Sequence, residues 1–217
     1  MNKQQERAAY GPGWGEVLLG VTLSLILGVL CAAIYLVFKP VVIAKEPSEA
    51  IFQDAIYYLP GTTNVAAGRT WMRKKQVLVE GHAGDLLLSE EELNAWATAT
   101  MKPAENSTDT IVPAQINFRI NENILQIAAP TTFKVLGYDV PVVIQARGNF
   151  ERVGEHYVFQ PTELLLGSLA THRIPGATPK VAQYLLQVQP FPADVTEGLK
   201  RASHAVVEGD QLRLTFP

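Results

Sequence analysis

Residues 116–150 read INFRINENILQIAAPTTFKVLGYDVPVVIQARGNF. Apolar and polar residues alternate here with a period of two, which is typical of strands that bury one face. Turn residues at 121–123 and 137–139 divide the stretch, so that Ile124–Ala129 follows the first turn and Val140–Phe150 the second. Strands joined by such short turns pair antiparallel. The stretch therefore predicts an antiparallel meander.

The meander extends beyond Phe150. A third turn is expected at Glu151–Glu155, followed by strands at Tyr157–Phe159 and Leu164–Leu166. The chain closes with a hairpin that turns at residues 208–210, and its last strand is expected to join the same sheet.

Helical signals flank the meander. Ser89 and Glu92 form a capping-box pattern that opens a helix running to about Met101, and Leu88 can pack on Leu93 as a staple. A second helix is expected from Thr178-Pro179 and a short third one after Asp194. A short helix ending near Leu59 fits the pattern Ile51, Ala55, Ile56 and Leu59, while residues 65–79 fit a helix or a strand.

Residues 17–38 contain 22 positions with no charge and no proline. At about 1.5 Å per residue they make a helix of roughly 33 Å, long enough to cross a hydrocarbon core of about 30 Å. The apolar run continues through Ile34, Leu36 and Phe38, which favours an uncleaved anchor over a secretory signal. Small residues recur every fourth position along one face and suit packing against another membrane helix or a second copy, although such stripes also arise by chance: Gly20, Ser24, Gly28 and Ala32.

These signals predict an α+β protein with an N-terminal transmembrane helix and an antiparallel sheet flanked by helices. The expected parts are a short tail at 1–16, the transmembrane helix at 17–38, a juxtamembrane connector with a short helix at 39–84, and a β-rich domain at 85–217. The basic residues on the two sides of the helix nearly cancel, so the charge bias does not fix the orientation.

Composition bounds the chemistry. From Pro40 onward the chain carries 15 Lys and Arg against 19 Asp and Glu, a balance that disfavours nucleic-acid binding. The single cysteine, Cys31, lies in the apolar helix, so the domain is expected to have no disulfide and no cysteine-based zinc site.

Catalytic motifs are absent from the sequence. The four histidines are far apart, and Gly167-Ser168 lacks the second glycine of a nucleophile elbow. Glu90, Glu91 and Glu92 are interpreted as solvated first-turn acids. We therefore expect no enzyme activity, no cofactor and no metal; an enzyme would need a polar cleft that gathers Asp85, His156 or His172.

The order of several motifs resembles the YpmS-like family of bacterial single-pass membrane proteins. The resemblance is carried by LSEEELNAW at 88–96, the strand pair 116–127, KVLGYDVP at 134–141, and residues 157–167 followed by Ile174-Pro175. It implies that 85–217 is an extracytoplasmic, periplasmic domain with a fold similar to tubular lipid-binding (TULIP-like) proteins, in which a curved antiparallel sheet is wrapped around one or two helices. The resemblance supplies no catalytic residues. The residues 51–80 and 169–173 depart from the family pattern.

The expected role is a membrane-anchored, non-catalytic domain that binds an acyl chain or another envelope protein. Its groove candidates are equally the expected core: Leu93, Trp96, Phe118, Ile127, Phe133, Val143, Phe159, Leu165 and Leu185. The alternative is an accessory subunit that packs onto a larger membrane complex through the small-residue stripe. A basic group at Arg69, Arg73, Lys74 and Lys75 suits either anionic lipid headgroups or plain solvent.

Overall fold

The computed structural model describes residues 11–44, 56–80, 82–100, 110–181 and 192–217. The chain forms two compact units, Met1–Val37 and Phe38–Pro217. The second unit, called the domain below, includes the residues expected as a connector. The α+β class with an N-terminal apolar helix and antiparallel sheets is confirmed.

The helix α2 (Trp14–Phe38) makes up nearly all that is described of the first unit. Its first turn closes where the backbone N–H groups of Glu16 and Val17 donate to the Gly13 carbonyl, and Pro40 lies two residues after its end. Among the described residues it is the one helix long and apolar enough to cross a membrane. Its length and composition are compatible with a single-pass or signal-anchor protein.

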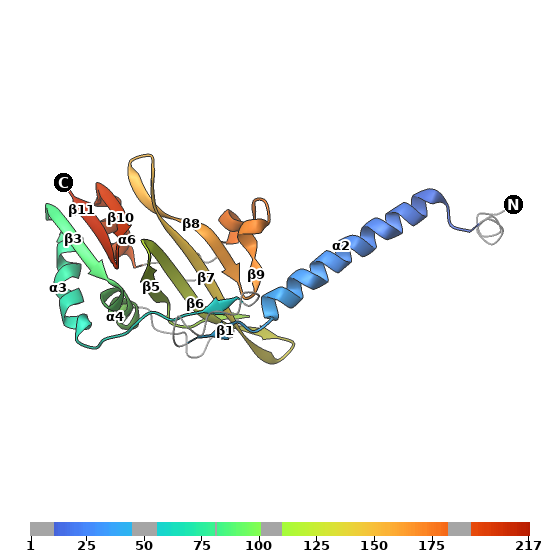
Figure 1. Ribbon diagram of the computed structural model, residues 1–217, viewed down its shortest axis with the longest axis horizontal. Helices are drawn as coiled ribbons and strands as arrows, with labels where there is room; N and C mark the ends of the chain where they lie inside the picture. The colour runs from blue at the N-terminus through green and yellow to red at the C-terminus, as the bar shows by residue number, and fades with distance from the viewer. Residues whose placement is uncertain (1–10, 45–55, 81, 101–109, 182–191) are drawn as a thin grey trace. The chain divides into compact units, whose positions relative to one another are not determined.

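The large sheet has the order β4-β6-β7-β8-β9, with β5 also paired to β6, and every pairing is antiparallel (Figure 1). Its strands are β4 (Ile111–Pro113), β5 (Asn117–Asn121), β6 (Ile124–Val135), β7 (Tyr138–Val153), β8 (His156–Leu166) and β9 (Leu169–Ala170). The predicted meander is thus confirmed. Two boundaries differ. The strand expected at Ile124–Ala129 continues to Val135, and the β6–β7 turn is Leu136-Gly137, both in the left-handed region at φ 51° and 85°.

The strand β8 is continuous because it carries a bulge. Ala146 of β7 pairs with Leu164, and Gly148 pairs with Pro161, so β8 has one residue more than β7 between these pairs. An extra residue reverses the alternation of side chains along a strand. The apolar positions of β8 therefore change from odd to even numbers while staying on one face of the sheet. The expected separate strands at 157–159 and 164–166 are two halves of β8.

Gly148 is required at this bulge. A Cβ atom built there would overlap the carbonyl oxygen of Gln160 and the Cα of Pro161. The backbones of β7 and β8 therefore approach each other more closely than any side chain permits.

A smaller antiparallel sheet has the order β10-β11-β3, with β3 (Gly84–Ser89), β10 (His204–Glu208) and β11 (Gln211–Phe216). The C-terminal hairpin is confirmed, but its last strand pairs with β3 and not with the meander, so that part of the prediction was wrong. Two asparagines connect the sheets: Asn149 Oδ1 accepts from the Val207 N–H at 3.2 Å, and Asn123 Oδ1 accepts from the Gly209 N–H at 2.5 Å.

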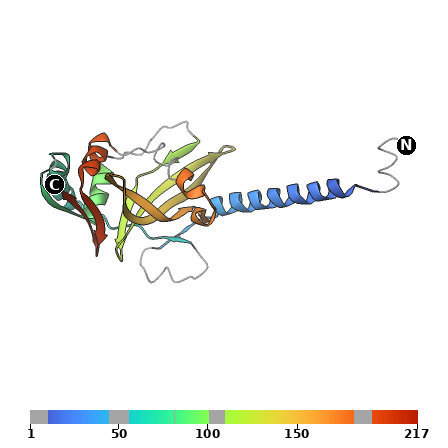
Figure 2. The same ribbon diagram turned by 90° about the horizontal axis from the view of Figure 1, so that it is seen from above.

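Helices α3 (Ala67–Glu80), α4 (Glu90–Thr100) and α6 (Ala193–Arg201) gather with the smaller sheet at one end of the large sheet (Figures 1 and 2). The segment 65–79, ambiguous in sequence, is thus helical for most of its length. The capping box is confirmed: the Ser89 N–H donates to Glu92 Oε2 at 2.9 Å, and the Glu92 N–H donates to Ser89 Oγ at 3.3 Å. The short helix after residue 192 is also present, and residues 177–181 form the described start of the second predicted helix.

The outer face of the large sheet, on which Ala128 and Val143 lie, is covered by the connector. There β1 (Val42–Ile43) pairs in parallel with β2 (Tyr57–Tyr58), and Tyr58 packs against Ala128 and Val143. Residues 57–58 were expected at the end of a helix and instead form a strand, in which Tyr58 is buried. Most of the expected helix, at 51–55, lies outside the described residues.

We predict that Gly148→Ala destabilises the domain by about 1–3 kcal/mol or more, since overpacking forces the backbone apart. Gly68→Ala in α3 is the matched control, because a Cβ there meets no atom within 4 Å. Urea unfolding of both variants measures the effect, and an equal loss in the two would contradict the proposed clash.

Alkaline pH is predicted to weaken the packing of Tyr58. Burial raises the pKa of Tyr58 from 10.0 to about 12, so the neutral phenol is favoured in the folded state. Its stabilising effect is full below pH 10 and is lost as the pH rises toward 12, by about 1.4 kcal/mol per unit. Unfolding free energies of the wild type and Tyr58→Phe should therefore diverge over this range. Parallel pH profiles would rule out the assignment to Tyr58.

Candidate functional site: an apolar cavity

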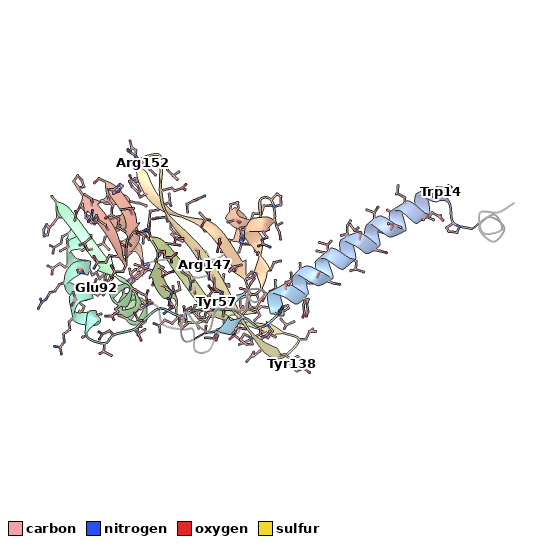
Figure 3. All side chains as sticks on the ribbon, viewed as in Figure 1. Trp14, Tyr57, Glu92, Tyr138, Arg147 and Arg152 are labelled. Carbon is pink, nitrogen blue, oxygen red and sulfur yellow. The ribbon has the colours of Figure 1, made fainter. Side chains whose placement is uncertain are left out.

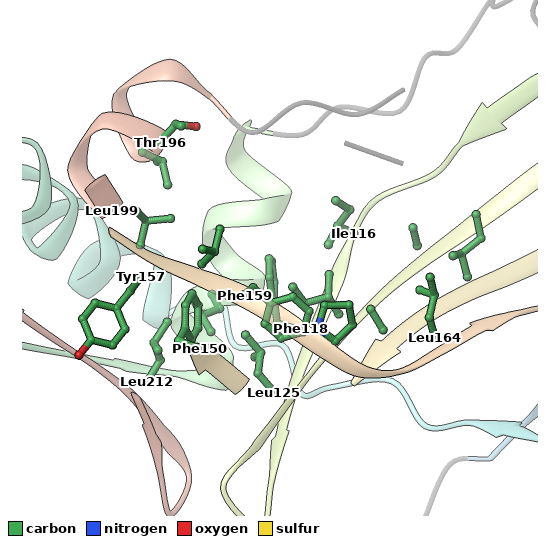
Figure 4. Close-up of a pocket in the computed structure, with 18 of the residues that line it drawn as sticks. Ile116, Phe118, Leu125, Phe150, Tyr157, Phe159, Leu164, Thr196, Leu199 and Leu212 are labelled. Atoms are coloured by element: carbon green, nitrogen blue, oxygen red, sulfur yellow. The ribbon is translucent and has the colours of Figure 1, made fainter. Parts of the chain in front are cut away.

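A cavity of about 890 Å³ lies against the inner face of the large sheet, opposite the face that Tyr58 covers (Figure 4). Its size is near the upper end of the range for small-molecule sites, about 300–1,000 Å³. Walls come from β6, β7 and β8, from β5 and α4, and from α3 and α6 at the end where the smaller sheet lies.

Strand register explains why one face is apolar. Leu125, Ile127 and Ala129 alternate along β6 and oppose Gly148, Ala146 and Ile144 of β7. Beyond β7 the bulge keeps both halves of β8 facing the same cavity, and the residues concerned are Tyr157, Phe159, Pro161, Leu164 and Leu166.

Aromatic rings line two parts of the wall. The Trp96 ring of α4 lies between Trp71 of α3 and Phe118 of β5, with both centroid separations 5.7 Å. Phe150 and Phe159 face each other across β7 and β8 at 5.9 Å. Contacts of this kind stabilise the walls beyond the effect of buried area alone.

Most of the groove residues predicted from sequence come together here. Six of them line the cavity: Leu93, Trp96, Phe118, Ile127, Phe133 and Phe159. Val143 and Leu165 are not among the lining residues, and Val143 packs under Tyr58 on the outer face. Both stand in runs of three apolar residues, which occur because the sheet is covered on two sides. Leu185 lies outside the described residues.

Sequence reasoning missed the contributions of α3 and α6. Trp71 and Leu78 of α3 line the cavity, as do Val195 and Leu199 of α6. A signal was present, because residues seven apart, and also four apart, fall on one face of a helix. Because 65–79 fitted a helix or a strand equally, this helical spacing could not be recognised in α3.

A buried amide fixes α4 beside β5. Asn94 is 1% exposed; its Nδ2 donates to the carbonyls of Phe118 at 2.8 Å and Thr62 at 2.9 Å, and its Oδ1 accepts from the Phe118 N–H at 2.7 Å. Gly61 lies so close that a Cβ there would overlap the Phe118 carbonyl oxygen. The network holds the Trp96 helix against the strand that bears Phe118.

The three acids at the start of α4 all accept hydrogen bonds from other parts of the domain. Glu90 Oε2 accepts from the Ile120 N–H at 2.8 Å, and Glu91 accepts from Asn64 Nδ2 at 3.2 Å. Glu92 is 4% exposed and pairs with Lys74 Nζ at 2.6 Å. The expectation of solvated caps was therefore wrong for Glu92, whose burial is offset by the capping box and the lysine.

Polar lining groups are few and mostly satisfied within the domain. The hydroxyls of Thr131 and Thr196 donate to the backbone carbonyls of Ala129 and Pro192. The Tyr157 hydroxyl lies 3.0 Å from His204 Nδ1. A cavity lined in this way offers an incoming molecule apolar contact and few hydrogen bonds.

Three exposed residues with basic side chains also line the cavity: His156, Lys180 and Lys200. His156 Nδ1 lies 3.1 Å from the Lys200 carbonyl oxygen. Lys200 Nζ lies 2.8 Å from Glu197, whose carboxyl pKa is lowered by this hydrogen bond and charge. These groups would suit an acidic head group better than a basic one.

The structure does not gather the residues that an enzyme was expected to need. Of Asp85, His156 and His172, only His156 lines the cavity. Asp85 accepts from the Thr215 hydroxyl at 2.7 Å, and His172 contacts the backbone of Leu164. Within the described ranges, no group of three His, Cys, Asp or Glu residues could hold a metal ion.

Two other sequence features have definite positions. The small-residue stripe of α2 is exposed along its whole length, at Gly20, Ser24, Gly28 and Ala32. In the basic group, Lys74 is occupied by Glu92, and α3 lies at the end of the domain away from β1 in Figure 1. The place where the chain joins the domain is therefore not beside this basic group.

Comparisons with family models, curated proteins and solved structures give no match to this chain.

We predict that Asn94→Ala lowers the free energy of unfolding by about 2–4 kcal/mol, because Phe118 loses partners for two buried backbone groups that cost about 1–3 kcal/mol each. Thr100→Ala is the control, since Thr100 is exposed and its hydroxyl donates within α4, to the Trp96 carbonyl four residues earlier. Chemical denaturation compares the two, and similar small losses would refute a special role for the Asn94 network.

Proposed function

We propose that this chain is a membrane-anchored, non-catalytic protein whose domain binds the acyl chain of a lipid in the apolar cavity. The observation that carries the proposal is the cavity of about 890 Å³ with walls of aliphatic and aromatic side chains. Apolar contact is the interaction that acyl chains offer, at about 0.8 kcal/mol per buried methylene.

Half-buried residues support an accessible cavity. Ile127, Ala129 and Ala146 are intermediate in exposure, whereas their outer-face neighbours Ala128 and Gln145 are 0% exposed. A solid core would bury the inner face at least as completely. The apolar helix α2 supports the membrane location, with the domain proposed to be extracytoplasmic.

The resemblance to YpmS-like proteins is consistent with this function and remains a proposal. In that view the large sheet curves around α4, and the space between them is the lipid site. The competing role is an accessory subunit, with the Gly20, Ser24, Gly28 and Ala32 face of α2 packed on a partner helix.

Photo-crosslinking in liposomes tests lipid binding. Full-length protein is irradiated with a diazirine-bearing fatty acid, and the crosslinked peptides are mapped. We expect crosslinks on β6, β7 and β8 at cavity residues. Crosslinks confined to α2 would contradict the proposal and leave the accessory role as the better account.

Filling the cavity provides the matched variant. Ala146→Phe occupies the volume of several methylenes worth about 0.8 kcal/mol each, so we expect binding to fall by about tenfold or more with the unfolding midpoint retained. Ala99→Phe on the exposed side of α4 is the control. A large loss of stability in Ala146→Phe would indicate a filled core instead of a binding site.

A further inference from the structure

The turn between β6 and β7 exposes large apolar side chains. Leu136 is 94% exposed and Tyr138 is 74% exposed, and Tyr138 projects from the end of this hairpin in Figure 3. Neither side chain contributes to the core of the domain. The tip of this hairpin therefore holds apolar surface that no part of the described domain covers.

The backbone of this turn makes the choice of leucine unusual. Leu136 has φ 51°, a left-handed conformation that asparagine and glycine adopt more readily than leucine. The β5–β6 turn has the same form, with Glu122 and Asn123 at φ 51° and 64°, and carries polar residues. Leucine at 136 is therefore unfavourable for two reasons: its backbone conformation is left-handed, and its apolar side chain is exposed to water.

The turn lies near the point where the chain joins the domain. Phe38, the last residue of α2 and the first of the domain, has its ring 6.0 Å from the Phe133 ring of β6. The Ser168 hydroxyl donates to the Lys39 carbonyl at 3.4 Å. Leu136 follows Phe133 by three residues, a backbone distance of about 10 Å at roughly 3.3 Å per residue.

We propose that the β6–β7 turn is a membrane-docking tip, with Leu136 and Tyr138 entering the boundary between lipid headgroups and acyl chains. This inference rests on the membrane anchoring proposed above. Because Phe38 contacts Phe133, the tip lies close to the point of the domain from which α2 departs. Apolar side chains of interfacial elements enter the bilayer by about 5–10 Å, and tyrosine is favoured at this depth.

Site-specific fluorescence tests the contact on the full chain. In a Cys31→Ser background, Leu136→Cys is labelled with an environment-sensitive nitrobenzoxadiazole dye and placed in nanodiscs of phosphatidylethanolamine and phosphatidylglycerol. Met72→Cys is the control, because Met72 is 73% exposed on α3 at the other end of the domain. We expect a blue-shifted emission at position 136 that lipids with a doxyl group on the acyl chain quench, and a water-like emission at position 72.

A second variant separates docking from folding. Leu136→Asn suits the left-handed turn, so its unfolding midpoint in detergent should equal or exceed that of the wild type. In nanodiscs, protection of the β6–β7 turn from amide exchange should nevertheless fall.

Three outcomes would overturn the inference. The first is a water-like emission at position 136, and the second is unchanged amide protection of the turn in Leu136→Asn. The third is quenching seen only in samples where the tip crosslinks to a second copy of the chain, since the tip would then contact protein and not lipid. Carbonate washing distinguishes the two proposals. Release of the full chain would refute the anchoring itself, whereas an anchored chain with a water-like tip would refute docking alone.

Discussion

The close approach of β7 and β8 at Gly148 is the constraint on which the inner face depends. With no side chain at 148, β8 can accommodate one additional residue between its pairs with Ala146 and Gly148. That residue brings Tyr157, Phe159 and Pro161 to the same face as Leu164 and Leu166. Without it, one half of β8 would direct its apolar residues to the other face, and the cavity would lose part of a wall.

Polar contacts complete the enclosure where apolar packing cannot specify position. Asn94 joins α4 to β5 through both backbone groups of Phe118, and Glu92 joins α4 to α3 through Lys74. Arg201 donates to the carbonyls of Leu78 and Val79 and so ties α6 to the end of α3. Because buried polar groups need specific partners, these bonds select one arrangement of the three helices.

The sequence predicted the hairpins well because their signals are local. Alternation and turn residues gave β5, β6 and β7 their pairing, and Ser89 with Glu92 gave the start of α4. Longer-range features were not predictable. The short leucine run of β3 becomes a strand only by pairing with β11, and no local sequence signal marks the bulge in β8. Six of the predicted groove residues line the cavity, whereas Val143 and Leu165 do not, because apolar runs carry no information about which face each residue occupies.

The pairing of β1 with β2 limits how far the domain can reach. Val42 is already held against Tyr57, so only residues 39–41 separate the end of α2 from the first fixed strand. Three extended residues span about 10 Å at most. If α2 is held in a bilayer, this short linker keeps the domain beside that bilayer. A lipid bound by the domain would then be exchanged with the same membrane and could not be carried across a wide aqueous gap.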